Sequence, residues 1–225
     1  MKSCKVKICG IRLPEEIHII NSLEPDYIGF VLAPSKRQVT VEQVRSLSKK
    51  VKSTIQKVGV FVNPKIPEAA SLLIEGVIDI IQLHGQEDLA YIHDLKSYVE
   101  ENIGPLQYPW ILKAMRIEQA SDVDKAASFA KQVDKNCFRL LLDGKSPGSG
   151  QSFDWQLLKG FPEEYLLAGG LSPENVAKAI GLLNPMGIDV SSGVEMPREG
   201  YPGETIKSEE RIKALYEALE KGKTE

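Results

Sequence analysis

Two side chains at the ends of apolar segments are suited to proton transfer. Cys9 follows Lys7 by two residues in the segment Lys5–Ile11, so both point to the same side of an extended chain. A neighbouring ammonium stabilises a thiolate, and we expect a lowered pKa and a role for Cys9 as base or nucleophile. Asp143 closes the segment Phe138–Asp143, where partial burial would raise its pKa and suit a general acid. The alternatives are an inert buried thiol and a carboxylate that caps the following loop.

Two further apolar segments, Tyr165–Gly169 and Gly187–Ser191, run into small residues. Small side chains let backbone amides approach a ligand closely, and amides converging from two neighbouring strand ends suit a phosphate dianion. The pattern therefore predicts binding of a phosphorylated small molecule at these two segment ends, which run into Gly170 and into Ser191, Ser192 and Gly193.

Three more polar residues lie where apolar segments end or near that point. Arg37 follows the second segment, and its guanidinium suits a carboxylate, unless it is simply a solvated loop arginine. His84 shares a face with Gln82 and is expected in a polar wall, since no second histidine stands at metal-ligand spacing. Asp189 is expected either to orient the phosphate or sugar hydroxyls, or to make a structural hydrogen bond. No metal site is expected.

Alternating strand and helix patterns must position these residues. Eight short Val/Ile/Leu-rich segments predict strands: Lys5–Ile11, Tyr27–Ala33, Lys57–Asn63, Asp79–His84, Ile111–Arg116, Phe138–Asp143, Tyr165–Gly169 and Gly187–Ser191. Helices are expected at Val41–Val51, Glu87–Glu100, Glu118–Gln132, Pro173–Leu183 and Ser208–Leu219, and loops at Glu101–Tyr108, Lys145–Gly150 and Glu195–Lys207. An open sheet is the alternative, but eight units favour an α/β fold of the (β/α)₈ TIM-barrel type, as one domain over residues 1–225. Such barrels carry their sites at the carboxyl ends of the strands.

Composition narrows the functional classes. The 225 residues carry a net charge of -3, and no basic stripe is present, which argues against nucleic-acid binding. No apolar run reaches membrane-spanning length, and no signal-peptide pattern opens the chain, so a cytoplasmic protein without membrane contact is expected. The three cysteines form no C-x-x-C pair, which fits a reducing compartment.

The chain also resembles the phosphoribosylanthranilate isomerase family along nearly its whole length. The matching segments are Lys7–Gly10, Gly29–Phe30, Ser35–Arg37, Val58–Asn63, Gln82–Gly85, Leu141–Asp143, Gly148–Gly150, Phe153–Trp155, Ala168–Leu171 and Asp189–Glu195. The resemblance implies a (β/α)₈ barrel, no cofactor and no metal, acting in tryptophan biosynthesis on a small phosphosugar–anthranilate substrate. It implies Cys9 as base, Asp143 as acid, Arg37 at the anthranilate carboxylate and phosphate at Gly170 and Ser191–Gly193. Lys7, His84 and Asp189 are expected to line the same site, in a monomer or homodimer.

One position departs from the family pattern, because Gly144 stands where a larger residue is expected after the acid. The other candidates are a histidine-pathway aldose–ketose isomerase, which would place an aspartate at Cys9, and an indole-glycerol-phosphate synthase, which would need an inward Lys and Glu pair. A non-catalytic phosphate- or flavin-binding barrel would leave the thiol and the acid unexplained.

Overall fold

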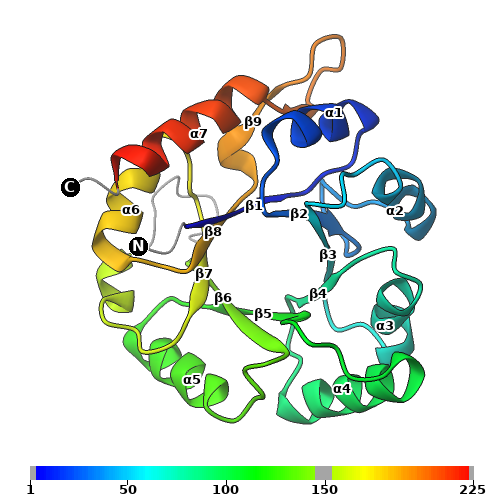
Figure 1. Ribbon diagram of the computed structural model, residues 1–225. Helices are drawn as coiled ribbons and strands as arrows, with labels where there is room; N and C mark the ends of the chain where they lie inside the picture. The colour runs from blue at the N-terminus through cyan, green and yellow to red at the C-terminus, as the bar shows by residue number, and fades with distance from the viewer. Residues whose placement is uncertain (1–3, 145–153, 223–225) are drawn as a thin grey trace.

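Eight parallel strands close into a ring, with helices around its outside (Figure 1). The computed structural model describes residues 4–144 and 154–222. The strands pair in sequence order from β1 to β8, and β8 pairs with β1 to close the barrel. The expected (β/α)₈ fold is therefore confirmed. The strands are β1 (Lys5–Cys9), β2 (Tyr27–Val31), β3 (Gln56–Phe61), β4 (Ile80–Leu83), β5 (Ile111–Arg116), β6 (Phe138–Asp143), β7 (Tyr165–Ala168) and β8 (Gly187–Val190).

Helices follow most of the strands. Their bounds are α1 (Pro14–Leu23), α2 (Val41–Ser48), α3 (Ile66–Ile74), α4 (Leu89–Ile103), α5 (Ala120–Ala130), α6 (Val176–Leu183) and α7 (Glu209–Lys221), with short 3₁₀ turns η1 (Trp155–Leu158) and η2 (Ser192–Val194). The sequence patterns had not singled out α1 and α3, which both begin with a proline in their first turn. The expected loop at Lys145–Gly150 lies outside the described residues.

Several expected boundaries were wrong by a few residues. Six of the eight strands differ from the predicted segments at one end or both, and most of them are shorter because residues of the flanking turns were counted as strand. Helix α4 runs on to Ile103, into the segment expected to be a loop. Helix α6 begins at Val176 rather than Pro173, since the Asn175 side chain folds back and accepts the Ser172 amide at 2.9 Å.

The barrel separates two apolar layers. Because side chains alternate along each strand, Val6 and Ile8 of β1 pack outward toward the helices, whereas Cys9 belongs to the cluster inside the ring. The inner cluster contains Cys9, Val58, Val60, Ile80, Leu112, Ala114, Leu141, Leu166 and Ala168. The alternation on β1 thus places Cys9 on the inside of the ring, as predicted. No helix within residues 4–144 and 154–222 has the length and apolar character to cross a membrane.

A two-stranded hairpin replaces the loop expected at Glu195–Lys207. Strand β9 (Glu195–Pro197) pairs antiparallel with β10 (Thr205–Lys207), and Glu195 lies directly opposite Lys207. Figure 1 shows this segment projecting beyond the barrel beside α1. The glycines and prolines between the two strands had suggested a loop, but they form only the turn of the hairpin. The hairpin brings side chains from far along the sequence to the end of β1.

Candidate active site

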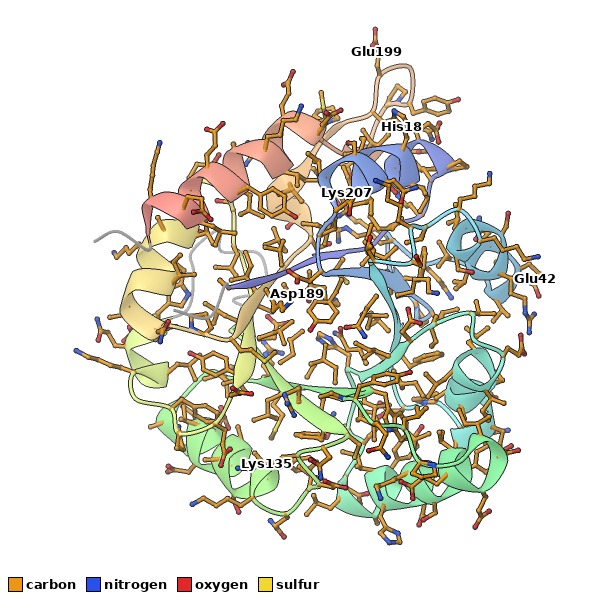
Figure 2. The ribbon with its side chains drawn as sticks, in the orientation of Figure 1. His18, Glu42, Lys135, Asp189, Glu199 and Lys207 are labelled. Atoms are coloured by element: carbon orange, nitrogen blue, oxygen red, sulfur yellow. The ribbon has the colours of Figure 1, made fainter. Side chains whose placement is uncertain are left out.

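Lys7 and Cys9 on β1 are buried, and Lys7 contacts the partly buried Asp189 on β8. Lys7 pairs in register with Asp189, and its Nζ donates a hydrogen bond to Asp189 Oδ1 at 3.0 Å. Figure 2 shows Asp189 within the ring of strands, whereas His18, Glu42, Lys135 and Glu199 lie on its outer side. Gly29 of β2 leaves space for Lys7 and Cys9, because a Cβ there would lie 2.7 Å from Cys9 Sγ and 3.1 Å from Lys7 Nζ.

The pKa of the Cys9 thiol is raised above its usual range, contrary to the expectation that Lys7 would lower it. Burial, which disfavours the thiolate, is the largest cause, and it outweighs the opposing attraction of Lys7. Asp189 adds to the rise through its negative charge. Burial also disfavours the charged form of Lys7, but the nearby Asp189 and Cys9 leave its pKa raised overall. Burial therefore disfavours the Cys9 thiolate, whereas the Lys7 cation next to it favours that form.

Asp143 lies at the carboxyl end of β6, beside His84. The distance from His84 Nε2 to Asp143 Oδ2 is 3.5 Å, and Gln82 Nε2 lies 3.0 Å from His84 Nδ1. The other oxygen, Oδ1, is buried and has no hydrogen-bond partner among the described residues. A cavity of about 540 Å³ is lined by both Asp143 and His84. A buried carboxyl oxygen without a partner is costly, and such groups are concentrated where a protein contacts its substrate.

Arg37 is held by an ion pair rather than solvated. Its Nε and Nη2 donate to the two carboxylate oxygens of Glu195 at 2.6 and 2.8 Å. This pair occupies one edge of the guanidinium and leaves the edge formed by Nη1 and Nη2 for a second carboxylate. Gly10, at a φ of 86°, packs against the Arg37 side chain so closely that a Cβ would overlap Cδ. This packing places Arg37 next to the end of β1.

The loops after β7 and β8 meet at the same end of the barrel. Gly170 has a φ of 66°, in the region that favours glycine. Gly193 lies against the backbone of Leu171, where any side chain would overlap the carbonyl oxygen. Ser191 Oγ donates to the Cys9 carbonyl at 3.0 Å, which ties the loop after β8 to the end of β1. The structure thus brings Gly170 and Ser191–Gly193 to the same end of the barrel as Cys9 and Arg37.

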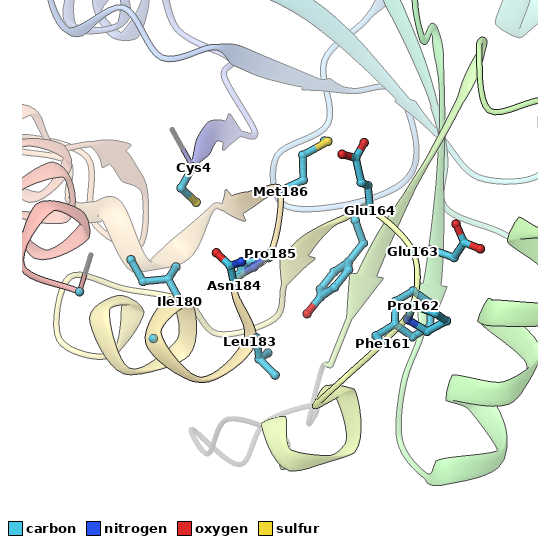
Figure 3. Close-up of a pocket in the computed structure, with 13 residues that line it drawn as sticks. Cys4, Phe161, Pro162, Glu163, Glu164, Ile180, Leu183, Asn184, Pro185 and Met186 are labelled. Carbon is cyan, nitrogen blue, oxygen red and sulfur yellow. The ribbon is translucent and has the colours of Figure 1, made fainter. Parts of the chain in front are cut away.

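A cavity larger than the one beside Asp143 lies at the opposite end of the barrel (Figure 3). Its volume is about 630 Å³, and its walls include Cys4, Tyr165 and Met186. Cys4 and Met186 directly precede β1 and β8, and Tyr165 begins β7, so this cavity opens at the amino ends of the strands. That end of a (β/α)₈ barrel serves stability rather than chemistry. Cavity size is therefore a poor guide to the site here, and the titratable groups are a better one.

The sequence analysis missed Glu195 and Lys207 as site residues. Lys207 is fully buried, and its Nζ donates to Glu195 Oε1 at 2.7 Å. The cations Arg37 and Lys207 hold the pKa of Glu195 at about 2, although burial alone would raise it. A signal existed in the sequence: Glu195 lies two residues after Gly193 of the loop after β8, at the start of a segment that otherwise suggested only a loop. Among the described residues, no three His, Cys, Asp or Glu side chains gather as metal ligands.

The fold and the site define a class. A closed parallel barrel with an acid and a thiol at its carboxyl end, next to two glycine- and serine-rich loops, is a (β/α)₈ barrel of the kind that carries acid–base chemistry on phosphorylated small molecules. Comparison with known sequences identifies the family within this class. Residues 6–217 match the family model described as N-(5′-phosphoribosyl)anthranilate isomerase. The chain belongs to this family, and its members are isomerases of tryptophan biosynthesis.

Individual relatives agree with this assignment. The N-(5′-phosphoribosyl)anthranilate isomerase of Thermoanaerobacter sp. (strain X514) is 41% identical over 88% of this chain and 91% of its own. The crystal structure of the Thermotoga maritima isomerase superposes with a TM-score of 0.77 at 32% identity, covering 96% of this chain and 98% of that one. A solved isomerase in complex with reduced 1-(o-carboxyphenylamino)-1-deoxyribulose 5-phosphate has a TM-score of 0.74 at 30% identity, covering 99% of this chain and 100% of that one.

Proposed function

We propose that this chain isomerises N-(5′-phosphoribosyl)anthranilate to 1-(2-carboxyphenylamino)-1-deoxyribulose 5-phosphate, with Cys9 as the base and Asp143 as the acid. The assignment of this reaction rests on the match to the family model over residues 6–217. The residue roles rest on inward strand positions at the end of the barrel where such sites lie. The solved relative bound to a reduced form of this product supports the substrate class.

The reaction is an Amadori rearrangement, in which Asp143 and Cys9 each carry out one proton transfer before a final tautomerisation. Asp143, protonated, donates its proton to the furanose ring oxygen, and the C1–O bond breaks to give a protonated imine. Cys9, as thiolate, removes the proton from C2, and the electron pair moves to the imine nitrogen to form an enolamine. The enolamine then becomes the ketone, as C1 gains a proton and the hydroxyl on C2 loses one. The aromatic amine nitrogen accepts the electrons, so these steps use only side chains of the chain itself.

The remaining residues bind and orient the substrate. The free edge of the Arg37 guanidinium holds the anthranilate carboxylate, and the loops at Gly170 and Ser191–Gly193 hold the phosphate. Lys7 stabilises the Cys9 thiolate, and Asp189 fixes Lys7 through the 3.0 Å ion pair. His84 occupies the wall next to Asp143. A cytoplasmic location and a monomeric or homodimeric state stay predictions, the second of which light scattering of the purified chain would decide.

The purified chain is expected to convert phosphoribosylanthranilate generated in situ, which is measured as the decay of the substrate's fluorescence. The decay should be first order in enzyme, and it should need neither added metal nor cofactor. Chelator-treated enzyme serves as the control. A folded chain that leaves the fluorescence unchanged would contradict the proposed reaction and favour another phosphosugar barrel.

Arg37→Ala is expected to raise KM about 10- to 100-fold while kcat falls much less. The variant loses charge-assisted hydrogen bonds to a group that does not react, and each such bond contributes about 1.5–3 kcal/mol. Steady-state kinetics measure both constants. The matched control is Arg45→Ala, which breaks a similar two-point pair with Glu75 on the surface. An unchanged KM in Arg37→Ala would remove this residue from the carboxylate site.

A further inference from the structure

We propose that the β9–β10 hairpin positions the substrate carboxylate. Glu195 holds one edge of the Arg37 guanidinium so that the other edge presents a fixed pair of donors, and Lys207 links this pair to the loop after β8. Glu195 is thus a positioning residue that acts through Arg37. This inference rests on the proposed function, since it needs Arg37 to bind a carboxylate.

Each carboxylate oxygen of Glu195 accepts two hydrogen bonds. Oε1 accepts from Arg37 Nε at 2.6 Å and from Lys207 Nζ at 2.7 Å. Oε2 accepts from Arg37 Nη2 at 2.8 Å and from Thr205 Oγ1 at 2.9 Å. A carboxylate with both oxygens doubly satisfied and a side chain only 8% exposed has little freedom to rotate. The Arg37 guanidinium, which is hydrogen-bonded to both of these oxygens, is therefore also held in one orientation.

The hairpin itself is anchored to the body of the protein. The Lys207 amide donates to Glu16 Oε1 at 3.0 Å, and the Arg12 side chain bonds the Thr205 carbonyl. The other Glu16 oxygen accepts the amides of Arg12 and Leu13 at the start of α1. Helix α1 therefore holds β10 in place, and β10 in turn holds Glu195. Because Glu195 already fixes the Arg37 side chain, binding a carboxylate costs less side-chain entropy than it would at a freely rotating arginine.

Charge also favours a second carboxylate at Arg37. Glu195 forms ion pairs with both Arg37 and Lys207, so this group of three side chains carries two positive charges and one negative charge. The Arg37 side chain remains 29% exposed, so part of it can be reached from solvent. A substrate carboxylate at the free edge of the guanidinium would complete the pairing.

The hydrogen bonds of Lys207 also reach the loop after β8. Lys207 Nζ donates to the Ser191 carbonyl at 3.1 Å, and Ser191 Oγ donates to the Cys9 carbonyl. Figure 2 shows Lys207 between the ring of strands and α1. One buried lysine therefore contacts both the residue that orients Arg37 and the loop that is to hold the phosphate. These contacts of Lys207 therefore fix the distance between the proposed carboxylate site at Arg37 and the proposed phosphate site.

Two ligands test the proposal by isothermal titration calorimetry. One is reduced 1-(o-carboxyphenylamino)-1-deoxyribulose 5-phosphate, and the other is the same compound made from aniline, which lacks the carboxyl group. Glu195→Gln is expected to weaken the first ligand about tenfold or more and the second less than about twofold. Arg37→Ala should likewise remove the preference for the carboxyl group. Glu75→Gln, which alters a surface pair of the same geometry, should bind both ligands as the wild type does.

The outcomes separate this inference from the proposed function. Equal weakening of both ligands in Glu195→Gln would show a merely structural role, and unchanged binding of both would show no role; either result overturns the inference while the wild type stays active. Should Glu195→Gln fail to fold, Thr205→Val provides the milder test, because it removes one hydrogen bond to Oε2 and keeps the charge. Thr205→Val is expected to lower the preference for the carboxyl ligand several-fold. An unchanged preference would also overturn the inference.

Discussion

Replacing Cys9 with alanine is expected to lower kcat by at least ~100-fold, because a general base contributes about 10²–10⁴-fold to a proton transfer. The substitution removes one sulfur atom from a buried position, so the barrel should still form. Fluorescence-decay kinetics give kcat, and circular dichroism checks the fold. Cys137→Ser is the matched control, because Cys137 is also a buried thiol but lies just before β6, at the amino ends of the strands.

The pH profile supplies a second signature of the same thiol. Burial raises the pKa of Cys9, and a base is active only after it loses its proton. In the free wild-type enzyme, kcat/KM should therefore rise as the pH increases above neutrality. That rise should disappear from the residual activity of Cys9→Ala. Near-wild-type kcat in Cys9→Ala, or a profile that keeps its alkaline rise, would show that another group removes the C2 proton.

Asp143→Asn is expected to cause the second large loss, again at least ~100-fold in kcat. Asparagine has nearly the same shape and can still contact His84, but it has no acidic proton to give to the ring oxygen. Because the substrate's carboxylate and phosphate contacts remain, KM should change much less than kcat. A stopped-flow or steady-state fluorescence assay separates the two constants.

Asp79→Asn is the control for this carboxylate. Asp79 accepts the Lys57 amide at 2.7 Å at the other end of the barrel, far along the strands from the proposed chemistry. Its substitution should leave kcat close to the wild-type value. A loss in Asp143→Asn that appears mainly as a higher KM would make Asp143 a binding residue, and ring opening would then need a different acid.

The alternation of side chains in the sequence determined much of the site. Lys7 and Cys9 share a face, and the apolar residues Val6 and Ile8 occupy the other, so the inward direction of the thiol could be predicted. Asp143 and the loops at Gly170 and Ser191–Gly193 were found in the same way, from the ends of apolar segments. These features depend on neighbours within a few residues, and local pattern is the information that a single sequence carries most directly.

Only the tertiary structure decided how the charges are paired. Arg37 meets Glu195 across 158 positions, and Lys7 meets Asp189 across 182, distances at which no local pattern operates. The rise in the Cys9 pKa likewise depends on burial and on the negative charge of Asp189, which pairs with Lys7. The sequence by itself therefore determined the fold, the family resemblance and the candidate groups. Closure of the barrel decided their partners and protonation, because electrostatic energies depend on spatial distance and solvent exclusion rather than on sequence separation.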